Sequence, residues 1–96
     1  MEVSGKPSVQ IIEVTMHWSL GFHLRPVARF VKYARQFRST IRIKKGKITA
    51  DGKNIMGLLL LAVAWKSKIH IEAEGDDAEQ AIEGIKAFFS TREKDK

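Results

Sequence analysis

The sequence predicts an α+β fold, a two-layer open-faced β-sandwich in which three helices cover one face of a four-stranded, mainly antiparallel sheet. Apolar residues alternate with period two in some segments and recur at helical spacing in others. These segments follow one another in the order β-α-β-β-α-β-α, which is typical of such a sandwich. With 96 residues, the chain has room for one core of this kind and for no second folding unit.

The first strand is expected to run from about Val9 to Trp18, because alternate residues along this segment are apolar. After Gly21 the spacing of the apolar residues changes to that of one face of a helix. These residues are Leu24, Val27, Phe30, Val31, Ala34 and Phe37. Pro26 suits the first turn of this helix, where a missing amide proton interrupts no helical hydrogen bond.

A hairpin is expected in the middle of the chain. Isoleucine and basic residues alternate over 41–44, and Lys45-Gly46 offers a turn. The segment 47–50 then continues as a short partner strand.

A second helix is expected over 55–64, directly after the turn that ends at Asn54. The Asn54 side chain can accept a hydrogen bond from an amide in the first turn of this helix. Because the helix is apolar nearly all round, one flank should be buried while another exposes apolar groups.

The last strand and the last helix complete the pattern. Alternating apolar residues over 69–73 mark a strand that ends at Gly75. Asp77 and Gln80 resemble a capping box at the start of the following helix. The buried face of that helix is expected to consist of Ala78, Ala81, Ile82, Ile85, Phe88 and Phe89.

Composition excludes several kinds of site. The chain has no cysteine, which rules out disulfides, thiolate metal sites and cysteine nucleophiles. The segment Met1–Gln10 lacks the apolar centre of a signal peptide, and the longest apolar run, Leu58–Trp65, is too short to span a bilayer. We therefore expect a cytoplasmic protein without membrane insertion, folded as one domain over 1–96. Its core should span about 9–89, followed by a frayed basic tail over 90–96.

The charge of the chain is strongly asymmetric. The net charge is +6, and no acidic residue occurs between Glu13 and Asp51. This pattern favours a basic face for an anionic ligand, a nucleic acid or an acidic protein, although an ordinary solvated face would look the same. Arg25, Arg29, Lys32 and Gln36 fall on one side of the first helix and form a basic stripe that could steer an acidic partner.

The segment 21–26 carries the candidate site, because it places His23 where a strand leads into a helix. Amides of the first helical turn lack partners within the helix, and the helix dipole adds partial positive charge there. Arg25 adds a full charge with a geometry suited to phosphate oxygens. A phosphate on the imidazole would be stabilised at this position. His17 and His70 lie on predicted strands without such neighbours, and neither a metal nor a cofactor is expected.

The hexapeptide G-F-H-L-R-P at 21–26 resembles the G-[LIM]-H-x-R-P active-site signature of HPr phosphocarriers in the phosphoenolpyruvate-dependent phosphotransferase system (PTS). The segments 53–57 (K-N-I-M-G) and 69–78 also resemble this family, in register. The resemblance implies that His23 accepts a phosphoryl group on Nδ1 from phosphorylated enzyme I and passes it to an EIIA-type acceptor. It also implies that Arg25 contacts this group.

The resemblance further implies the family's antiparallel open-faced sheet, whereas element order alone leaves a ferredoxin-like winding open. It implies a docking surface around the histidine and the start of the second helix, with Arg29 beside it in the basic stripe. The other expected docking residues are Phe22, Leu24, Ile55, Met56 and Leu59. Packing in the core is the alternative for Met56 and Leu59.

The chain departs from the family pattern at three positions. Asn54 stands where many members have a serine that a kinase phosphorylates, so this regulation is not expected here. Ala62, inside the second predicted helix, and Lys66, just after it, replace glycines of the family. If Lys66 has a left-handed backbone, it is strained by about 1 kcal/mol.

Two alternatives to a phosphoryl carrier remain. A basic sandwich with an open sheet is also typical of RNA-binding modules, but base stacking needs aromatic residues on the open face. We expect Thr15, His17, Arg42 and Lys44 there instead. A regulatory relative, whose phosphorylation state a partner senses, would keep the same histidine. No second group is placed to activate water, so we expect a monomeric relay intermediate rather than an enzyme with its own turnover.

Overall fold

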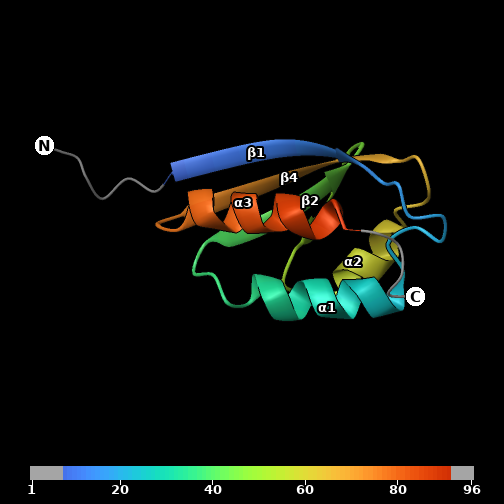
Figure 1. Ribbon diagram of the computed structural model, residues 1–96, viewed down its shortest axis with the longest axis horizontal. Coiled ribbons are helices and arrows are strands. Elements are labelled where there is room, and N and C mark those ends of the chain that lie inside the picture. The colour runs from blue at the N-terminus through green and yellow to red at the C-terminus, as the bar shows by residue number, and fades with distance from the viewer. Residues whose placement is uncertain (1–7, 92–96) are drawn as a thin grey trace, which may run out of the picture.

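The computed structural model describes residues 8–91, and its elements follow the predicted order (Figure 1). The elements are β1 (Ser8–Thr15), α1 (Leu24–Ala34), β2 (Thr40–Lys45), β3 (Ile48–Asp51), α2 (Ile55–Leu61), β4 (Lys68–Gly75) and α3 (Ala78–Phe89). Most of the expected frayed tail, from residue 92 onward, lies outside the described residues.

The four strands form one sheet in the order β1-β4-β2-β3, and every pairing is antiparallel. The helices lie on one side of this sheet, as Figure 1 shows. The register places Ile71 of β4 opposite both Ile12 and Ile43, so one row of isoleucines crosses three strands. The predicted open-faced α+β sandwich is therefore confirmed.

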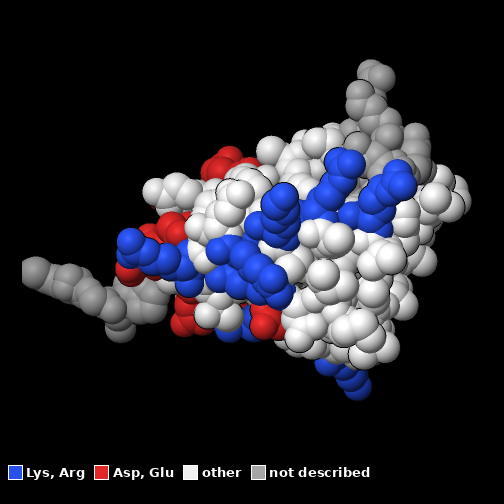
Figure 2. Space-filling model, turned by 90° about the horizontal axis from the view of Figure 1, so that it is seen from below, with Lys and Arg blue, Asp and Glu red and all other residues white. Residues whose placement is uncertain are grey.

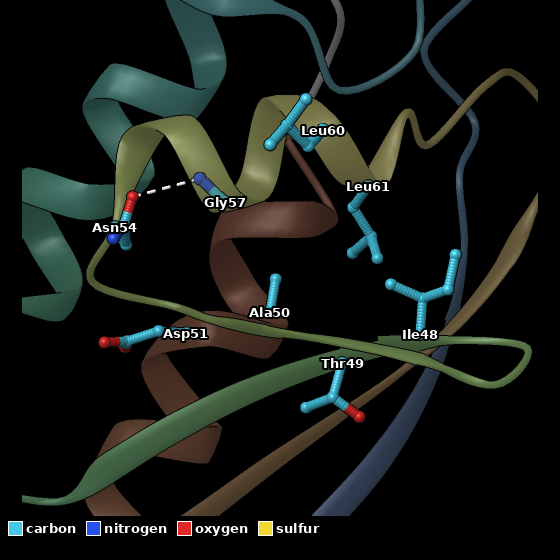
Figure 3. Close-up of a pocket in the computed structure, with 8 residues that line it drawn as sticks. All are labelled: Ile48, Thr49, Ala50, Asp51, Asn54, Gly57, Leu60 and Leu61. Carbon is cyan, nitrogen blue, oxygen red and sulfur yellow. Dashed lines mark hydrogen bonds between the residues drawn. The ribbon is translucent and has the colours of Figure 1, made fainter.

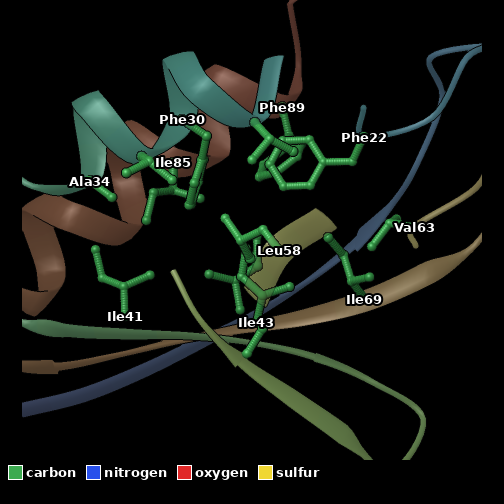
Figure 4. Close-up of a cluster of buried hydrophobic side chains, with 14 of the residues drawn as sticks. Phe22, Phe30, Ala34, Ile41, Ile43, Leu58, Val63, Ile69, Ile85 and Phe89 are labelled. Atoms are coloured by element: carbon green, nitrogen blue, oxygen red, sulfur yellow. The ribbon is translucent and has the colours of Figure 1, made fainter. Parts of the chain in front are cut away.

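The hydrophobic core lies between the helices and the sheet. Figure 4 shows Phe30, Leu58 and Ile85 from the helices facing Ile41 and Ile43 from β2. All five of these side chains are inaccessible to solvent. Burial of large apolar side chains on both layers is the main stabilising contribution to such a fold.

The strand β1 ends at Thr15, so the expected strand to Trp18 is too long. Met16 and Trp18 are both buried, which continues the alternating pattern, but the backbone has left the pairing with β4. The Met16 backbone instead exchanges hydrogen bonds of 2.8 Å with Lys66 and Ser67. Alternation reports which side chains are buried, and here it continues beyond the hydrogen-bonded ladder.

The turn of the hairpin lies one residue later than predicted. Lys45 pairs with Ile48, which leaves Gly46 and Lys47 as the two turn residues. Gly46 has a φ of 59°, a conformation that such two-residue hairpin turns require.

The helix α2 ends at Leu61 instead of Ala64, because Ala62 adopts a left-handed backbone with φ 54° and ψ 57°. The expectation that Ala62 lies inside the helix is therefore wrong. Lys45 helps to close this end, since its Nζ donates to the Ala62 carbonyl over 2.7 Å. Lys66 has a φ of 72°, which confirms the left-handed backbone considered for it.

The expected capping box at Asp77 and Gln80 is wrong. Asp77 precedes α3, but its side chain makes no capping hydrogen bond to that helix. Its carboxylate accepts bonds from the Ser39 hydroxyl (2.6 Å), the Ser39 amide (2.9 Å) and the Arg38 amide (2.9 Å). Asp77 therefore joins the start of α3 to the segment that leads into β2.

Replacing Asp77 by alanine should lower the free energy of unfolding by about 1.5 to 3 kcal/mol, because the buried Ser39 loses its charged acceptor. The Ser39 hydroxyl, followed by the Arg38 amide, lowers the pKa of Asp77. Because the pKa of Asp77 is lower in the folded state, the ionised carboxylate stabilises the fold fully at pH values above its unfolded-state pKa of about 3.9. This stabilisation is lost as the pH falls through the folded-state pKa. Urea unfolding at pH 7 and below pH 4 measures both effects.

Asp76 provides the matched control for this prediction. Its side chain is 81% exposed, and its ion pair with Arg38 spans 3.9 Å. Alanine at Asp76 should change the stability by less than about 0.5 kcal/mol. Equal losses for the two variants would contradict the role given to Asp77.

Candidate functional site

His23 is the residue that immediately precedes α1 and acts as its N-cap. Its backbone is extended, with φ −99° and ψ −172°, and its carbonyl accepts the first helical hydrogen bond from the Val27 amide over 2.9 Å. The imidazole makes no capping hydrogen bond and is half-buried. The backbone of His23 therefore starts the helix, while its ring is not used for capping.

The first turn of α1 presents an electropositive end next to this ring. The first amides of a helix have no acceptor within the helix, and Pro26, in the first turn of α1, has no amide proton to satisfy. No acidic residue stands in the first turn, and the Arg25 side chain is exposed. The helix end and the guanidinium group thus offer two kinds of positive charge to an anion.

The loop before His23 is fixed by a close approach of two backbone segments. The Phe22 amide donates to the Val63 carbonyl over 2.9 Å, and the Gly21 amide closes a turn on Trp18 over 2.8 Å. Gly21 has a φ of 73°, and a Cβ at this position would lie 2.5 Å from the Val63 carbonyl oxygen. Glycine is therefore required here both for its backbone conformation and for space.

Phe22, which we expected to contact a partner, is buried with 3% of its surface exposed. Its ring packs edge-on against Phe30 and Phe89, with ring centres 5.6 Å and 5.2 Å apart. Figure 4 shows it pointing into the core beside these two rings. The expectation for Phe22 is wrong in this respect, since the ring anchors the site loop and is not available to a partner.

The end of α3 packs against the same loop. Trp18 stacks on Phe89, with ring centres 5.6 Å apart, and its Nε1 donates to the Thr91 carbonyl over 3.0 Å. His17, expected on a strand, lies beyond β1, and its Nε2 donates to the Phe89 carbonyl over 2.6 Å. His17 therefore joins the site loop to α3.

Exposed apolar residues occur around the site. Leu24 and Met56, predicted as docking residues, are 61% and 63% exposed. Ile55 and Leu59 are half-buried and pack against the core. Three further apolar residues are exposed: one lies on α2, which was expected to expose apolar groups, and two lie outside the periodic segments, where the helical pattern gives no indication. These are Leu20 (63%), Leu60 (78%) and Trp65 (54%).

The expected basic stripe is present on α1. Arg25, Arg29 and Lys32 are all exposed, and Arg35 continues the series. Figure 2 shows Lys and Arg side chains crossing this face in a broken row, next to a broad area without charged side chains. The Arg35 guanidinium also donates to the Lys53 carbonyl over 3.2 Å and 3.3 Å, which links α1 to the turn before α2.

Asn54 caps α2 as predicted, with its Oδ1 accepting a hydrogen bond of 3.0 Å from the Gly57 amide (Figure 3). A shallow groove of about 310 Å³ runs between α2 and β3 beside this cap. Its lining residues are Ile48, Thr49, Ala50, Asp51, Asn54, Gly57, Leu60 and Leu61. Across residues 8–91, no group of three His, Asp or Glu side chains could hold a metal ion, and no helix could cross a membrane.

Residues 11–91 match the family described as "PTS HPr component phosphorylation site". The chain belongs to this HPr family of phosphocarriers of the phosphotransferase system.

Individual relatives agree with this assignment. The phosphocarrier protein HPr of Haemophilus influenzae is 39% identical over 75 residues, which cover 78% of this chain and 88% of the relative. The HPr-like protein Crh of Halalkalibacterium halodurans is 38% identical over 77 residues, covering 80% and 92% of the two chains. The crystal structure of HPr from Bacillus anthracis has a TM-score of 0.81 at 36% identity, covering 86% of this chain and 99% of that one.

Proposed function

We propose that the protein carries a phosphoryl group on Nδ1 of His23, receives it from phosphorylated enzyme I in the cytoplasm, and passes it to an EIIA-type acceptor. The observation that supports this most directly is the placement of His23, whose backbone caps α1 while its ring is not used for capping. In the transfer, the Nδ1 lone pair forms the bond to phosphorus. The bond between phosphorus and the donor breaks, and its electron pair stays with the donor.

The first turn of α1 supplies the groups that would hold the phosphoryl oxygens. The first amides of a helix have no acceptor within the helix, and the Arg25 guanidinium lies in this turn. A hydrogen bond to a charged group contributes about 1.5 to 3 kcal/mol, and a charge at a helix end about 0.3 to 1 kcal/mol. Contributions of this size favour loading of His23 without preventing release to an acceptor.

The surface around His23 supports docking of an acidic partner. Leu24 and Met56 are exposed apolar residues, and Arg29 belongs to the basic stripe on α1. Ile55 and Leu59 would contribute through their exposed parts, since both are half-buried. Electrostatic attraction to this face should raise the association rate, and added salt should lower it.

The open face of the sheet gives no support to the RNA-binding alternative. None of the four described strands contains Phe, Tyr or Trp on which bases could stack. Arg42, expected on this face, forms ion pairs with Glu72 (2.9 Å) and Glu74 (2.7 Å), and Lys44 lies 3.2 Å from Glu72. The hydrogen bonds from Arg42 and then Lys44 lower the pKa of Glu72. These cations are therefore engaged within the sheet.

The proposal is tested by incubating the protein with phosphoenolpyruvate and enzyme I, followed by measurement of the intact mass. The mass should increase by one phosphoryl group, and the increase should be lost in acid and kept in base, as for a phosphohistidine. No increase, or an increase that acid does not remove, would overturn the proposed function.

Alanine at Arg25 should slow phosphoryl transfer by about ten- to a hundredfold, because a charged hydrogen bond to the phosphoryl group is lost. The melting temperature should stay nearly unchanged, since the Arg25 side chain is exposed. Rapid-quench measurement of transfer from phosphorylated enzyme I provides the rate. Arg29→Ala, one turn along the helix, is the control and should show a smaller effect that disappears at high salt. Equal losses for both variants, or a large loss of stability, would contradict a direct role of Arg25.

A further inference from the structure

His17 is a second histidine close to the site, and the proposed phosphoryl transfer gives it no part in the reaction. Its Nε2 lies 2.6 Å from the carbonyl oxygen of Phe89, the last residue of α3. A carbonyl can only accept a hydrogen bond, so Nε2 carries the proton. The carbonyls of the last helical turn have no amide donor within the helix, and His17 supplies one from the segment before His23.

Trp18 makes a link of the same kind from the next position. Its Nε1 donates to the Thr91 carbonyl over 3.0 Å, and its ring stacks on Phe89 with ring centres 5.6 Å apart. The Trp18 carbonyl also accepts the Gly21 amide over 2.8 Å. Two consecutive side chains thus tie the segment 17–21 to the end of α3.

Phe89 connects this link to the site. While its carbonyl is held by His17, its ring packs against Phe22 and Phe30, with ring centres 5.2 Å and 5.6 Å apart (Figure 4). All three phenylalanine rings are buried, and Phe22 directly precedes His23. A buried, close-packed ring cannot shift without moving its neighbours. A displacement of Phe89 is therefore passed through Phe22 to the backbone of His23.

We infer that His17 is a positioning residue for phosphoryl transfer, which holds the end of α3 so that Phe89 and Phe22 keep the His23 imidazole in place. This inference rests on the proposed function. Transfer requires the attacking atom to lie about 3 to 3.5 Å from phosphorus with its lone pair aligned. A displaced loop therefore slows the reaction, even when every group that would contact the phosphoryl oxygens is retained.

The kinetic test compares His17→Leu with the wild type as substrates of enzyme I and phosphoenolpyruvate. Leucine removes the donor and keeps an apolar side chain in its place. The kcat should fall about three- to tenfold, the factor that corresponds to the loss of one neutral hydrogen bond. KM should stay nearly unchanged, because no docking residue is altered. His17→Gln should restore most of the rate, since its side-chain amide is again a donor.

Ser90→Ala is the matched control for the end of α3. The Ser90 hydroxyl donates to the Ala87 carbonyl over 2.9 Å, in the last turn of the same helix, and this bond stays within the end of α3. The variant removes one hydrogen bond from the helix end without loosening the site loop. It should be phosphorylated at the rate of the wild type. Equal losses for Ser90→Ala and His17→Leu would overturn the inference, because a general weakening of α3 would explain both.

Hydrogen exchange of two amides separates positioning from global stability. The Phe22 amide bonds to the Val63 carbonyl over 2.9 Å, and it should exchange faster in His17→Leu than in the wild type. Ile71, buried in the centre of the sheet, reports on opening of the core, and its amide should keep the exchange rate of the wild type. The same acceleration at both amides would overturn the inference, because His17 would then stabilise the whole fold and not the site loop.

The remaining outcomes distinguish this inference from the proposed function. If His17→Leu is phosphorylated with the kcat of the wild type, the inference fails and the carrier function stands. A rise confined to KM would also overturn it, since His17 would then contact the partner. So would a His17→Gln variant as slow as His17→Leu, because the donated hydrogen bond would not be what matters. If the wild type itself gains no phosphoryl group, the proposed function fails before any variant is compared.

Discussion

The variant His23→Ala should remain folded and gain no phosphoryl group from enzyme I and phosphoenolpyruvate. The helix starts through the His23 carbonyl, which the substitution keeps, and the imidazole makes no capping hydrogen bond that could be lost. The change in stability should therefore stay within about 0.5 kcal/mol. Intact-mass measurement gives the phosphoryl content, and thermal unfolding gives the stability of the same sample.

His70→Ala is the matched control for this experiment. His70 lies on β4, is about half exposed, and its Nε2 is 3.4 Å from the Glu13 carboxylate. The control should gain one phosphoryl group at the rate of the wild type. His17 is less suitable, because its ring holds the end of α3 through the Phe89 carbonyl. A phosphoryl group on His23→Ala would place the acceptor elsewhere in the chain.

The parts of the site that the sequence predicts well are those with local causes. His23 follows a strand and a glycine, and Pro26 marks the first turn of a helix, so neighbours in sequence determine the N-cap position. Asn54 caps α2 for the same reason, with its acceptor and donor three residues apart. The order of strands and helices can likewise be predicted from the local spacing of apolar residues, and for this reason the predicted fold class agrees with the structure.

The parts that sequence reasoning missed depend on contacts between distant segments. Asp77 bonds to Ser39, 38 residues away, instead of capping its own helix. Phe22 and Leu24 flank His23 and are both apolar, yet one is 3% and the other 61% exposed. The inward residue, Phe22, is the one whose amide bonds to Val63 and whose ring packs on Phe30 and Phe89, all of them distant in sequence or on other elements. The spacing of apolar residues along the sequence does not predict which of the two side chains is buried.

These distant contacts hold the loop that carries His23. The residue before His23 is held from one side by Val63 and from another by the rings of Phe30 and Phe89. A carrier must present its phosphoryl group to different partners in one geometry, which rigid support of the loop favours. Substitutions in this support should therefore affect transfer even though they leave His23 and Arg25 unchanged.

Gly21→Ala should show this effect, with a loss of about 2 to 5 kcal/mol in stability and slower phosphorylation of His23. The substitution strains a backbone with φ 73°, and its Cβ meets the Val63 carbonyl oxygen at 2.5 Å. Left-handed strain costs about 1 to 2 kcal/mol, and overpacking against backbone adds about 1 to 3 kcal/mol. Urea unfolding and transfer from phosphorylated enzyme I measure the two effects.

Gly46→Ala separates the clash from the strain. Gly46 also has a left-handed backbone, with φ 59°, but a Cβ there would meet nothing within 4 Å. This variant should lose about 1 to 2 kcal/mol from strain alone and be phosphorylated normally. If both alanines slow the transfer equally, stability rather than the position of the loop controls the rate. If Gly21→Ala alone slows it, under conditions where both proteins are folded, the contact between Gly21 and Val63 is what keeps the imidazole in place.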